Sequence, residues 1–494
     1  MYKIGFDNEK YLALQSEKIL ERVQKFGGKL YLEFGGKLFD DNHASRVLPG
    51  FEPDSKMRML MQLKDKAEIV IVINAEDIEK NKKRDDLGIT YDADVMRLID
   101  VFRDYGLYVG SVVLTRFAAQ SSAEQFENRL KAQSIRVYRH YSIRDYPNDL
   151  PLIFSDEGFG KNDYIETDRP IVIVTAPGPG SGKMATCLSQ LYHENKRGIQ
   201  SGYAKYETFP IWSIPLKHPV NLAYEAATAD LSDVNMIDPF HLEAYGETTV
   251  NYNRDIEIFP VLEAMFRRIY GKCPYKSPTD MGVNMAGFAI VDDEACREAS
   301  RQEIIRRYFA AANGVISGTS TQEELKKIEM LMSAQGLSVE MRKCVPVARK
   351  LAEQTGLPAV SIELPDGTLI TGKTTHLMGA CCAALINALK HLAGIPDKTD
   401  VLSSSVIKPI QHLKQEHLGS KNPRMHTNEM LIALAMSAVT NPIADLAMDQ
   451  LADMKGSEVH STVLLSSADR NTLKKLGANI TCDPVRDNRK LYQK

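Results

Sequence analysis

Apolar runs of strand length recur through the first third of the chain, separated by segments with helical patterns. The runs are residues 30–34, 68–74, 107–115, 134–140 and 171–175. Strands that alternate with helices favour a mostly parallel sheet covered by helices on both faces. We therefore expect an α/β, Rossmann-like fold, and we expect ligands to collect at the carboxyl ends of its strands.

The pattern changes after about residue 235. A helix near 254–270 and a charged helix near 294–311 flank a strand-like run at 285–291. A hairpin at 359–372 is indicated by the Asp366-Gly367 turn. We expect three regions, an α/β domain over 1–235, a mixed and mainly helical region over 236–357, and an α+β domain over 358–494 with a helical segment at about 398–456.

Composition narrows the function classes. The 61 basic and 64 acidic side chains give a net charge of -3 with no Lys/Arg block, which argues against nucleic acid as a partner. No apolar stretch approaches the roughly 20 residues of a membrane helix, and the first residues do not resemble a signal peptide. Seven scattered cysteines without a C-x-x-C pair are typical of reduced thiols. We expect a cytoplasmic protein without a membrane partner.

The segment PIVIVTAPGPGSGKM combines a strand, a glycine-rich loop and the start of a helix. This is the context of a phosphate-binding loop, whose backbone N–H groups converge on an anion. The expected ligand-binding residues are Gly178, Gly180, Ser181, Gly182 and Lys183, with the Lys183 charge also serving catalysis. The pattern G-x-x-x-x-G-K-[ST] is broken, because Pro177 replaces the first Gly and Met184 replaces the hydroxyl residue. A tight turn with a purely architectural role is the alternative.

Metal-assisted phosphoryl transfer would need acidic residues at the end of another strand. Asp292 and Asp293 follow the run 285–291 and are the expected metal ligands, with Asn74, Glu76 and Asp77 as the second choice. Each is also suited to capping a helix or to a solvated turn. The cofactor is unknown, with ATP or another nucleotide and Mg²⁺ as the candidates.

A second polar segment, EFGGKLFDDNHASRVLPGF, follows the strand 30–34. Asp41 and His43 are expected to act as acid and base, whereas Lys37 and Arg46 are expected to bind an anionic substrate. A long solvated connection between a strand and a helix is the alternative.

Other motifs favour structural roles. GTLITGKT at 367–374 matches the phosphate-loop pattern, but a hairpin strand explains it better. The chain has no H-E-x-x-H helix and no G-x-S-x-G elbow, which argues against peptidase activity. Small-residue helices at 376–394 and about 427–440 are compatible with a homo-oligomer or with an internal core.

The whole chain resembles a conserved bacterial family of unknown function. The resemblance rests on EFGGKLFDDNHASRVLPGF, VTAPGPGSGKMATCLSQLYHE, YETFPIWSIPLKHPVNLAYEAATADL and GSEVHSTVLLSSADRNTLKKLGANITCDP. Members have at times been labelled ATP-dependent peptidases, a label that the missing zinc and serine motifs leave unsupported here. The resemblance implies a Rossmann-like part with helical and α+β additions, and it implies no reaction.

These patterns lead to one main hypothesis, an enzyme that binds a nucleotide or another small phosphorylated molecule at 178–183 and transfers a phosphoryl or nucleotidyl group. A non-catalytic sensor of a phosphorylated metabolite is the first alternative. A glycine loop without any ligand is the second.

Overall fold

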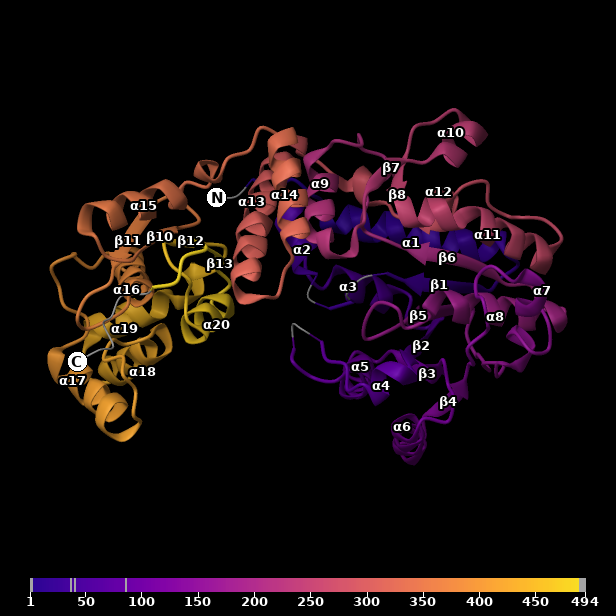
Figure 1. The fold of residues 1–494 in the computed structure, drawn as a ribbon, viewed down its shortest axis with the longest axis horizontal. Coiled ribbons are helices and arrows are strands. Elements are labelled where there is room, and N and C mark those ends of the chain that lie inside the picture. Colours follow the sequence, from indigo (N-terminus) through magenta and orange to yellow (C-terminus); the bar gives the residue numbers. More distant parts are fainter. Residues whose placement is uncertain (1–2, 36–37, 40, 85–86, 488–494) are drawn as a thin grey trace. The chain divides into compact units, whose positions relative to one another are not determined.

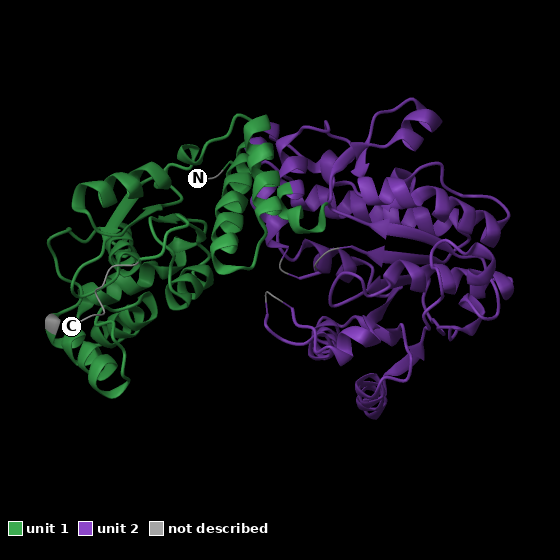
Figure 2. Ribbon diagram, in the orientation of Figure 1, with its two compact units in different colours: residues 1–3, 226–232, 298–494 green, residues 4–225, 233–297 purple. Residues whose placement is uncertain are grey.

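A computed structural model of the chain describes residues 3–35, 38–39, 41–84 and 87–487. It contains two compact units (Figure 2). The larger comprises residues 4–225 and 233–297, and the smaller comprises the described parts of 1–3, 226–232 and 298–494. The three regions that the pattern of helices and strands predicts, with boundaries near 235 and 357, stay a prediction.

The larger unit is built on a parallel sheet, as the sequence predicts (Figure 1). Within the described residues seven strands form it in the order β4-β3-β2-β5-β1-β6-β9, and every neighbouring pair is parallel. The strands are β1 (Leu30–Phe34), β2 (Ala67–Asn74), β3 (Tyr108–Thr115), β4 (Arg136–Arg139), β5 (Ile171–Thr175), β6 (Gly202–Tyr206) and β9 (Gly282–Val283). A separate antiparallel pair is formed by β7 (Asn235–Ile237) and β8 (Val250–Tyr252).

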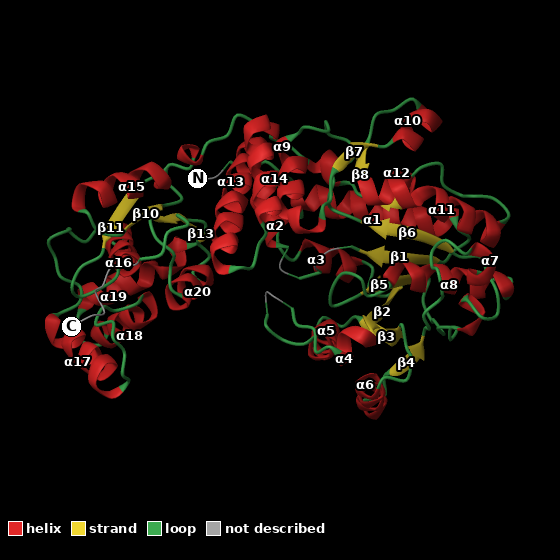
Figure 3. Cartoon of the chain, viewed as in Figure 1, coloured by secondary structure: helices red, strands yellow, loops and turns green. Residues whose placement is uncertain are grey.

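Helices of the larger unit cover both faces of this sheet (Figure 3). The described helices that lie wholly in the larger unit are α1 (Asn8–Lys25), α2 (Asn42–Val47), α3 (Ser55–Gln62), α4 (Ala75–Glu79), α5 (Tyr91–Asp104), α6 (Ser121–Ala132), α7 (Leu150–Ile153), α8 (Lys183–Lys196), α10 (Pro239–Tyr245), α11 (Asn253–Tyr270) and α12 (Pro278–Met281). On one face, alternate side chains of the central strands, such as Tyr31 and Val172, share a buried cluster with α8 and α11. On the other face α1 reaches β6, where the hydroxyls of Tyr11 and Tyr206 lie 2.6 Å apart.

Strand register brings three distant segments into one row. Val174 of β5 pairs with Glu33 of β1, and Glu33 pairs with Lys205 of β6. Because parallel strands end at the same edge, the segments that follow these three residues leave the sheet side by side. One of these segments is the glycine-rich loop.

The strand expected at 285–291 is wrong. Ala286–Ala289 form a 3₁₀ turn, and Ile290 makes only an isolated bridge to Phe6. Gly287 lets this turn pack closely against Ser213, since a Cβ on it would lie 2.1 Å from Ser213 Oγ. The Asn284 side chain accepts a hydrogen bond from Ala286 N and starts the turn.

The smaller unit has its own sheet and core. Its strands, in the order β11-β10-β12-β13, are β10 (Ala359–Glu363), β11 (Leu369–Lys373), β12 (Glu458–Ser461) and β13 (Asn479–Cys482). Its helices are α14 (Gln322–Ala334), α15 (Cys344–Thr355), α16 (Ala380–Leu392), α17 (Ser404–His412), α18 (Thr427–Ala438), α19 (Pro442–Asp449) and α20 (Ser467–Lys475). Two further helices, α9 (Pro219–Ala227) and α13 (Asp293–Ser317), include residues of both units.

The predicted hairpin at 359–372 is confirmed, because β10 and β11 pair antiparallel. The segment GTLITGKT therefore contains β11 and not a strand-to-helix loop. Gly372 has a packing role there, since a Cβ on it would lie 2.1 Å from the backbone nitrogen of Ala384 in α16. Within the described residues, no helix has the length and apolar character needed to cross a membrane.

Candidate functional site

The glycine-rich loop joins β5 to α8, as predicted. Gly180 and Gly182 have φ of 74° and 92°, values that favour glycine, and Gly182 is the N-cap residue of α8. A side chain of the neighbouring strand β3 also stabilises the loop. Thr115, the last residue of β3, donates its hydroxyl to the Ser181 carbonyl at 2.7 Å.

Two of the loop glycines also meet close neighbours. A Cβ on Gly178 would lie 2.3 Å from Tyr91 Oη, and one on Gly182 would lie 3.2 Å from Thr115 Cγ2. Ser181 is buried, and its hydroxyl donates to the Gly178 carbonyl at 2.8 Å. The Ser181 side chain therefore stabilises the loop, and its contribution to a ligand would come from the backbone.

The loop presents free backbone donors. No acceptor within the described chain receives the backbone N–H groups of Gly180, Ser181, Gly182 or Lys183, and no side chain caps α8. The Lys183 ammonium likewise has no hydrogen-bond acceptor among the described residues. One turn into α8, the buried hydroxyl of Thr186 has no hydrogen-bond partner among the described residues. Such a helix start, with its positive dipole end and a lysine, suits an anion.

A charged cluster, which we call the Lys205 cluster, lies at the ends of β1 and β6. The Lys205 ammonium is 2.5 Å from Asp255 Oδ2 and 2.6 Å from Glu207 Oε1. Asp255 is in the first turn of α11, and Glu207 directly follows β6. Glu33 belongs to the same group, since it pairs in register with Lys205 and its Oε2 accepts a hydrogen bond from Tyr203 at 2.7 Å. Two carboxylates thus contact one ammonium, and the charge of Glu33 acts on it as well.

Electrostatics make Glu207 distinct within this cluster. Burial raises its pKa, and Asp255 raises it further. Lys205 opposes both effects, and the resulting pKa is about 7. The pKa of Lys205 is also raised, because the attraction of Asp255, Glu207 and Glu33 outweighs the effect of burial. The side chains of Lys205, Glu207 and Asp255 are each about 15% exposed. A carboxyl group with a pKa near 7 can both accept and donate a proton at neutral pH.

Glu207 lines a small cavity. A cavity of about 10 Å³ is bounded by Glu207 and by polar side chains of the neighbouring segments, including Asn251, Thr279 and Asn284. Glu207 Oε2 lies 4.0 Å from the position of a Cβ on Gly282, so the glycine leaves room at this oxygen. The cavity has the size of about one water molecule.

The polar segment after β1 is only partly described. Lys37, an expected anion ligand, lies outside the described residues. Asp41 accepts a hydrogen bond from Ala44 N at the start of α2 and forms an ion pair with the buried Lys56 at 2.9 Å. Burial alone would raise the pKa of Asp41, but the charge and hydrogen bond of Lys56 hold it below its usual value.

The other two expected residues of this segment lie in α2. The His43 ring packs edge-on against Phe209 and Tyr224, with ring centroids 5.3 and 5.5 Å away. Arg46 is in the last turn of the helix. The catalytic roles of Asp41 and His43 stay a prediction.

The expected metal ligands occupy a helix start. Asp292 Oδ1 accepts a hydrogen bond from Ala295 N, and Asp293 contacts Arg297 at 2.6 Å and His218 Nε2 at 2.9 Å. They follow a 3₁₀ turn rather than a strand. Among the described residues, no group of three or more His, Cys, Asp or Glu side chains has a metal-binding arrangement. A magnesium site at Asp292 and Asp293 stays a prediction.

The smaller unit contains a Ser, His and Asp group that resembles a nucleophilic triad by composition only. The Ser466 hydroxyl donates to Asp469 at 2.7 Å, and both side chains contact the same nitrogen, Nδ1, of His426. In a catalytic triad the acid and the nucleophile contact opposite ring nitrogens. Asp469 also accepts a hydrogen bond from Thr427 N, so the group joins the starts of α18 and α20.

The sequence patterns did not reveal the Lys205 cluster. β6 is a short run, GYAKY, with a lysine in it, and its pattern does not predict a strand. The available signal was the alternation of Tyr203, Lys205 and Glu207, which places three polar or aromatic groups on one face of an extended chain. Glu33 and Asp255 come from distant elements, and no local spacing connects them.

Comparison with known proteins places these features in a family. The N-terminal domain of unknown function DUF1846 matches residues 4–336, and the C-terminal domain of unknown function DUF1846 matches residues 340–492. The chain is 58% identical over 494 residues to UPF0371 proteins of Streptococcus pneumoniae strains JJA and CGSP14, which covers the whole of each protein. UPF0371 protein spr0309 of strain R6 is equally similar. The chain therefore belongs to the DUF1846, or UPF0371, family of uncharacterised bacterial proteins.

Proposed function

We propose that this protein binds a small phosphorylated molecule at the glycine loop and acts on it by proton transfer through the Lys205 cluster. The row formed by Val174, Glu33 and Lys205 carries this proposal. Neighbouring strands lie about 4.8 Å apart, so the row spans about 10 Å. A metabolite held at the end of β5 is thus within reach of the groups at the end of β6.

The loop residues fit a phosphate group. Backbone N–H groups without acceptors, the positive end of α8 and the Lys183 ammonium are the features that such an anion requires. The fit to Mg²⁺ is poorer, since Met184 cannot supply the hydroxyl that usually helps hold the ion. A nucleotide such as ATP fits through its phosphates, and the proposed chemistry does not depend on a metal.

The Lys205 cluster supplies the chemistry. Glu207 exchanges protons near neutral pH, and it lines the 10 Å³ cavity. Lys205 and Asp255 fix the orientation of Glu207 through the 2.6 and 2.5 Å contacts. Proton transfer to or from a bound substrate, or to a water molecule, is the role of Glu207.

A non-catalytic sensor is the second candidate. The replacement of the loop hydroxyl by Met184 favours it, because binding without Mg²⁺ does not by itself lead to phosphoryl transfer. Such a sensor would bind the phosphorylated molecule and leave it unchanged.

Thermal unfolding with added phosphates tests binding. Probes are inorganic phosphate, ATP, ADP and ribose 5-phosphate, each with and without Mg²⁺. At 100 times its Kd a bound probe stabilises the protein by about 2.7 kcal/mol. Lys183→Ala should weaken the effect at least tenfold in Kd. Lys196→Ala is the matched control, since Lys196 lies at the other end of α8 and pairs with Asp156 on the surface. Equal affinities of Lys183→Ala and wild type would remove the glycine loop from the proposal.

Turnover separates the enzyme from the sensor. The probe that binds is incubated with wild type and with Glu207→Gln, and products are followed by ³¹P NMR. We expect Glu207→Gln to retain binding and to lose turnover. Binding without any product in the wild type would support the sensor instead.

A further inference from the structure

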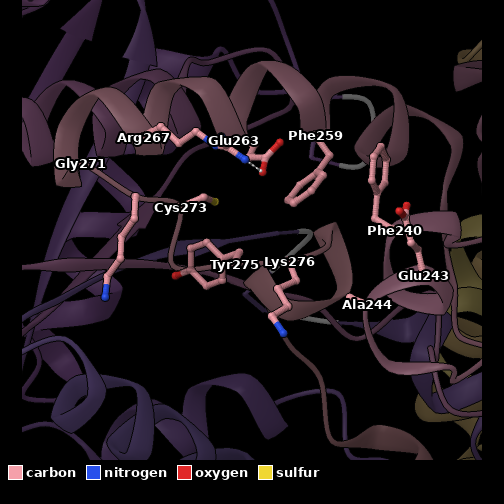
Figure 4. Close-up of a pocket in the computed structure, with 11 residues that line it drawn as sticks. Phe240, Glu243, Ala244, Phe259, Glu263, Arg267, Gly271, Cys273, Tyr275 and Lys276 are labelled. Atoms are coloured by element: carbon pink, nitrogen blue, oxygen red, sulfur yellow. Dashed lines mark hydrogen bonds and ion pairs between the residues drawn. The ribbon is translucent and has the colours of Figure 1, made fainter.

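A second, larger cavity lies in the larger unit, between α10, α11 and the chain that follows α11 (Figure 4). Its volume is about 700 Å³, within the range of about 300–1,000 Å³ that small-molecule sites occupy. The side chains that line it are both aromatic and charged. They come from Phe240, Glu243, Ala244, Phe259, Glu263, Arg267, Gly271, Lys272, Cys273, Tyr275 and Lys276.

Aromatic rings form the apolar wall. Phe240 and Phe259 have ring centroids 4.9 Å apart with the planes tilted by 55°. Tyr275 is buried, and its hydroxyl donates to the backbone carbonyl of Tyr203. Phe259 and Tyr275 are each 2% exposed and support the wall from within, so the partly exposed Phe240 is the ring on which a flat apolar ligand can stack.

The charged side chains favour an anion. Arg267 forms an ion pair with Glu263 at 2.7 Å, and the pair lies on the α11 side of the cavity (Figure 4). Within the described residues, neither the Lys272 nor the Lys276 ammonium pairs with a carboxylate. Lys276 lies across the cavity from Glu263 and Arg267 (Figure 4), with its ammonium 5.2 Å from the Tyr245 ring centroid. The lining residues carry three cations and two carboxylates.

This cavity is separate from the glycine loop and the Lys205 cluster. Tyr270 donates its hydroxyl to the Ser201 carbonyl, and Tyr275 contacts Tyr203, both at the beginning of β6. The Lys205 cluster lies at the end of the same strand. A ligand in the large cavity is therefore a different ligand from the one proposed for the loop.

We propose that the cavity is a binding site for a small aromatic anion, a flat ring system that carries a carboxylate or a similar acidic group. The ring stacks against Phe240, which packs on the buried Phe259, and the acidic group lies toward Lys272 and Lys276. The site is independent of the function proposed for the glycine loop.

Cys273 provides a local reporter. It is on the cavity wall and partly exposed, whereas the other six cysteines are buried. Partial burial raises the pKa of its thiol, so labelling by a maleimide becomes faster as the pH rises toward 8. A ligand in the cavity should slow this labelling.

The probe is 8-anilinonaphthalene-1-sulfonate, an aromatic anion whose fluorescence increases in apolar sites, and the control probe is the neutral N-phenyl-1-naphthylamine. We expect the anion to bind the full-length protein and to slow maleimide labelling of Cys273 at least fivefold, measured by peptide mass spectrometry. Ala244→Trp places a large side chain in the cavity and should weaken the binding of both probes at least tenfold.

Charge reversal tests the acidic group. Lys272→Glu combined with Lys276→Glu should weaken the anion at least tenfold and leave the neutral probe within twofold. Lys10→Glu combined with Lys326→Glu changes the net charge equally at exposed lysines elsewhere and should leave both probes unchanged. Binding of the neutral probe and circular dichroism establish that the variants are folded. Unchanged anion affinity in the cavity double variant, or no protection of Cys273 at saturation, would overturn the proposal.

Discussion

At the scale of single residues, Glu207 and Asp41 show how one neighbour decides the state of a buried carboxyl. Asp41 has the buried Lys56 at 2.9 Å, and this contact holds its pKa below the usual value against the effect of burial. Glu207 shares Lys205 with Asp255, so the attraction of the ammonium is divided. Burial then prevails, and the pKa of Glu207 rises to about 7.

This difference predicts a pH dependence of stability. A carboxyl whose pKa is about 7 in the folded protein and about 4.5 when unfolded binds more protons in the folded state between these values. Its contribution to the free energy of unfolding is therefore complete below about pH 4.5 and is lost as the pH rises through 7. Glu207→Gln cannot lose a proton, so its stability relative to wild type should increase by about 1–3 kcal/mol between pH 5 and 8. Denaturant unfolding at both pH values measures the change.

A matched control uses a more exposed carboxyl that has an arginine partner of its own. Glu263→Gln removes a partly exposed carboxylate paired with Arg267, and its stability relative to wild type should change little over the same range. A Glu207→Gln profile parallel to wild type would contradict the raised pKa.

At the scale of elements, the strands with continuous apolar runs are predictable from the sequence. The expected strands 30–34 and 171–175 coincide with β1 and β5, and the glycine loop between β5 and α8 followed from them. The strand β6 and the turn at 286–289 were not predicted, because short runs of small or mixed residues acquire their conformation from neighbours. The Lys205 cluster depends on register between strands, which local patterns do not contain.

Gly372 tests the packing of β11 against α16. A Cβ there would lie 2.1 Å from the Ala384 nitrogen, and a backbone cannot move away as a flexible side chain can. Gly372→Ala should lower the free energy of unfolding by about 3 kcal/mol, the upper range for overpacking. Gly379→Ala is the control, since its Cβ would lie 3.8 Å from Met425 O, and its effect should stay within about 0.5 kcal/mol. Equal melting curves for the two variants would contradict this role of Gly372. Neither substitution should alter phosphate binding at the glycine loop.

At the scale of the whole molecule, the accessibility of the cysteine thiols tests whether the cores of both units are closely packed. All seven cysteines lie among the described residues, and six are buried. Burial raises the pKa of these buried thiols, Cys381 and Cys382 among them, so they should be unreactive. A disulfide reagent at pH 8 should titrate about one thiol rapidly in the native protein and seven in guanidinium. Rapid native reaction of several thiols would contradict the burial of the cores.

The position of β1 in the sheet affects how the protein can be made. Its only neighbours in the described sheet are β5 and β6, and Leu30 pairs with Ile171, 141 positions along the chain from 30 to 171. At about 5–20 residues per second, a ribosome needs on the order of ten seconds to deliver that partner. A nascent chain therefore carries an early apolar strand whose two edges stay unpaired until the later strands have been made.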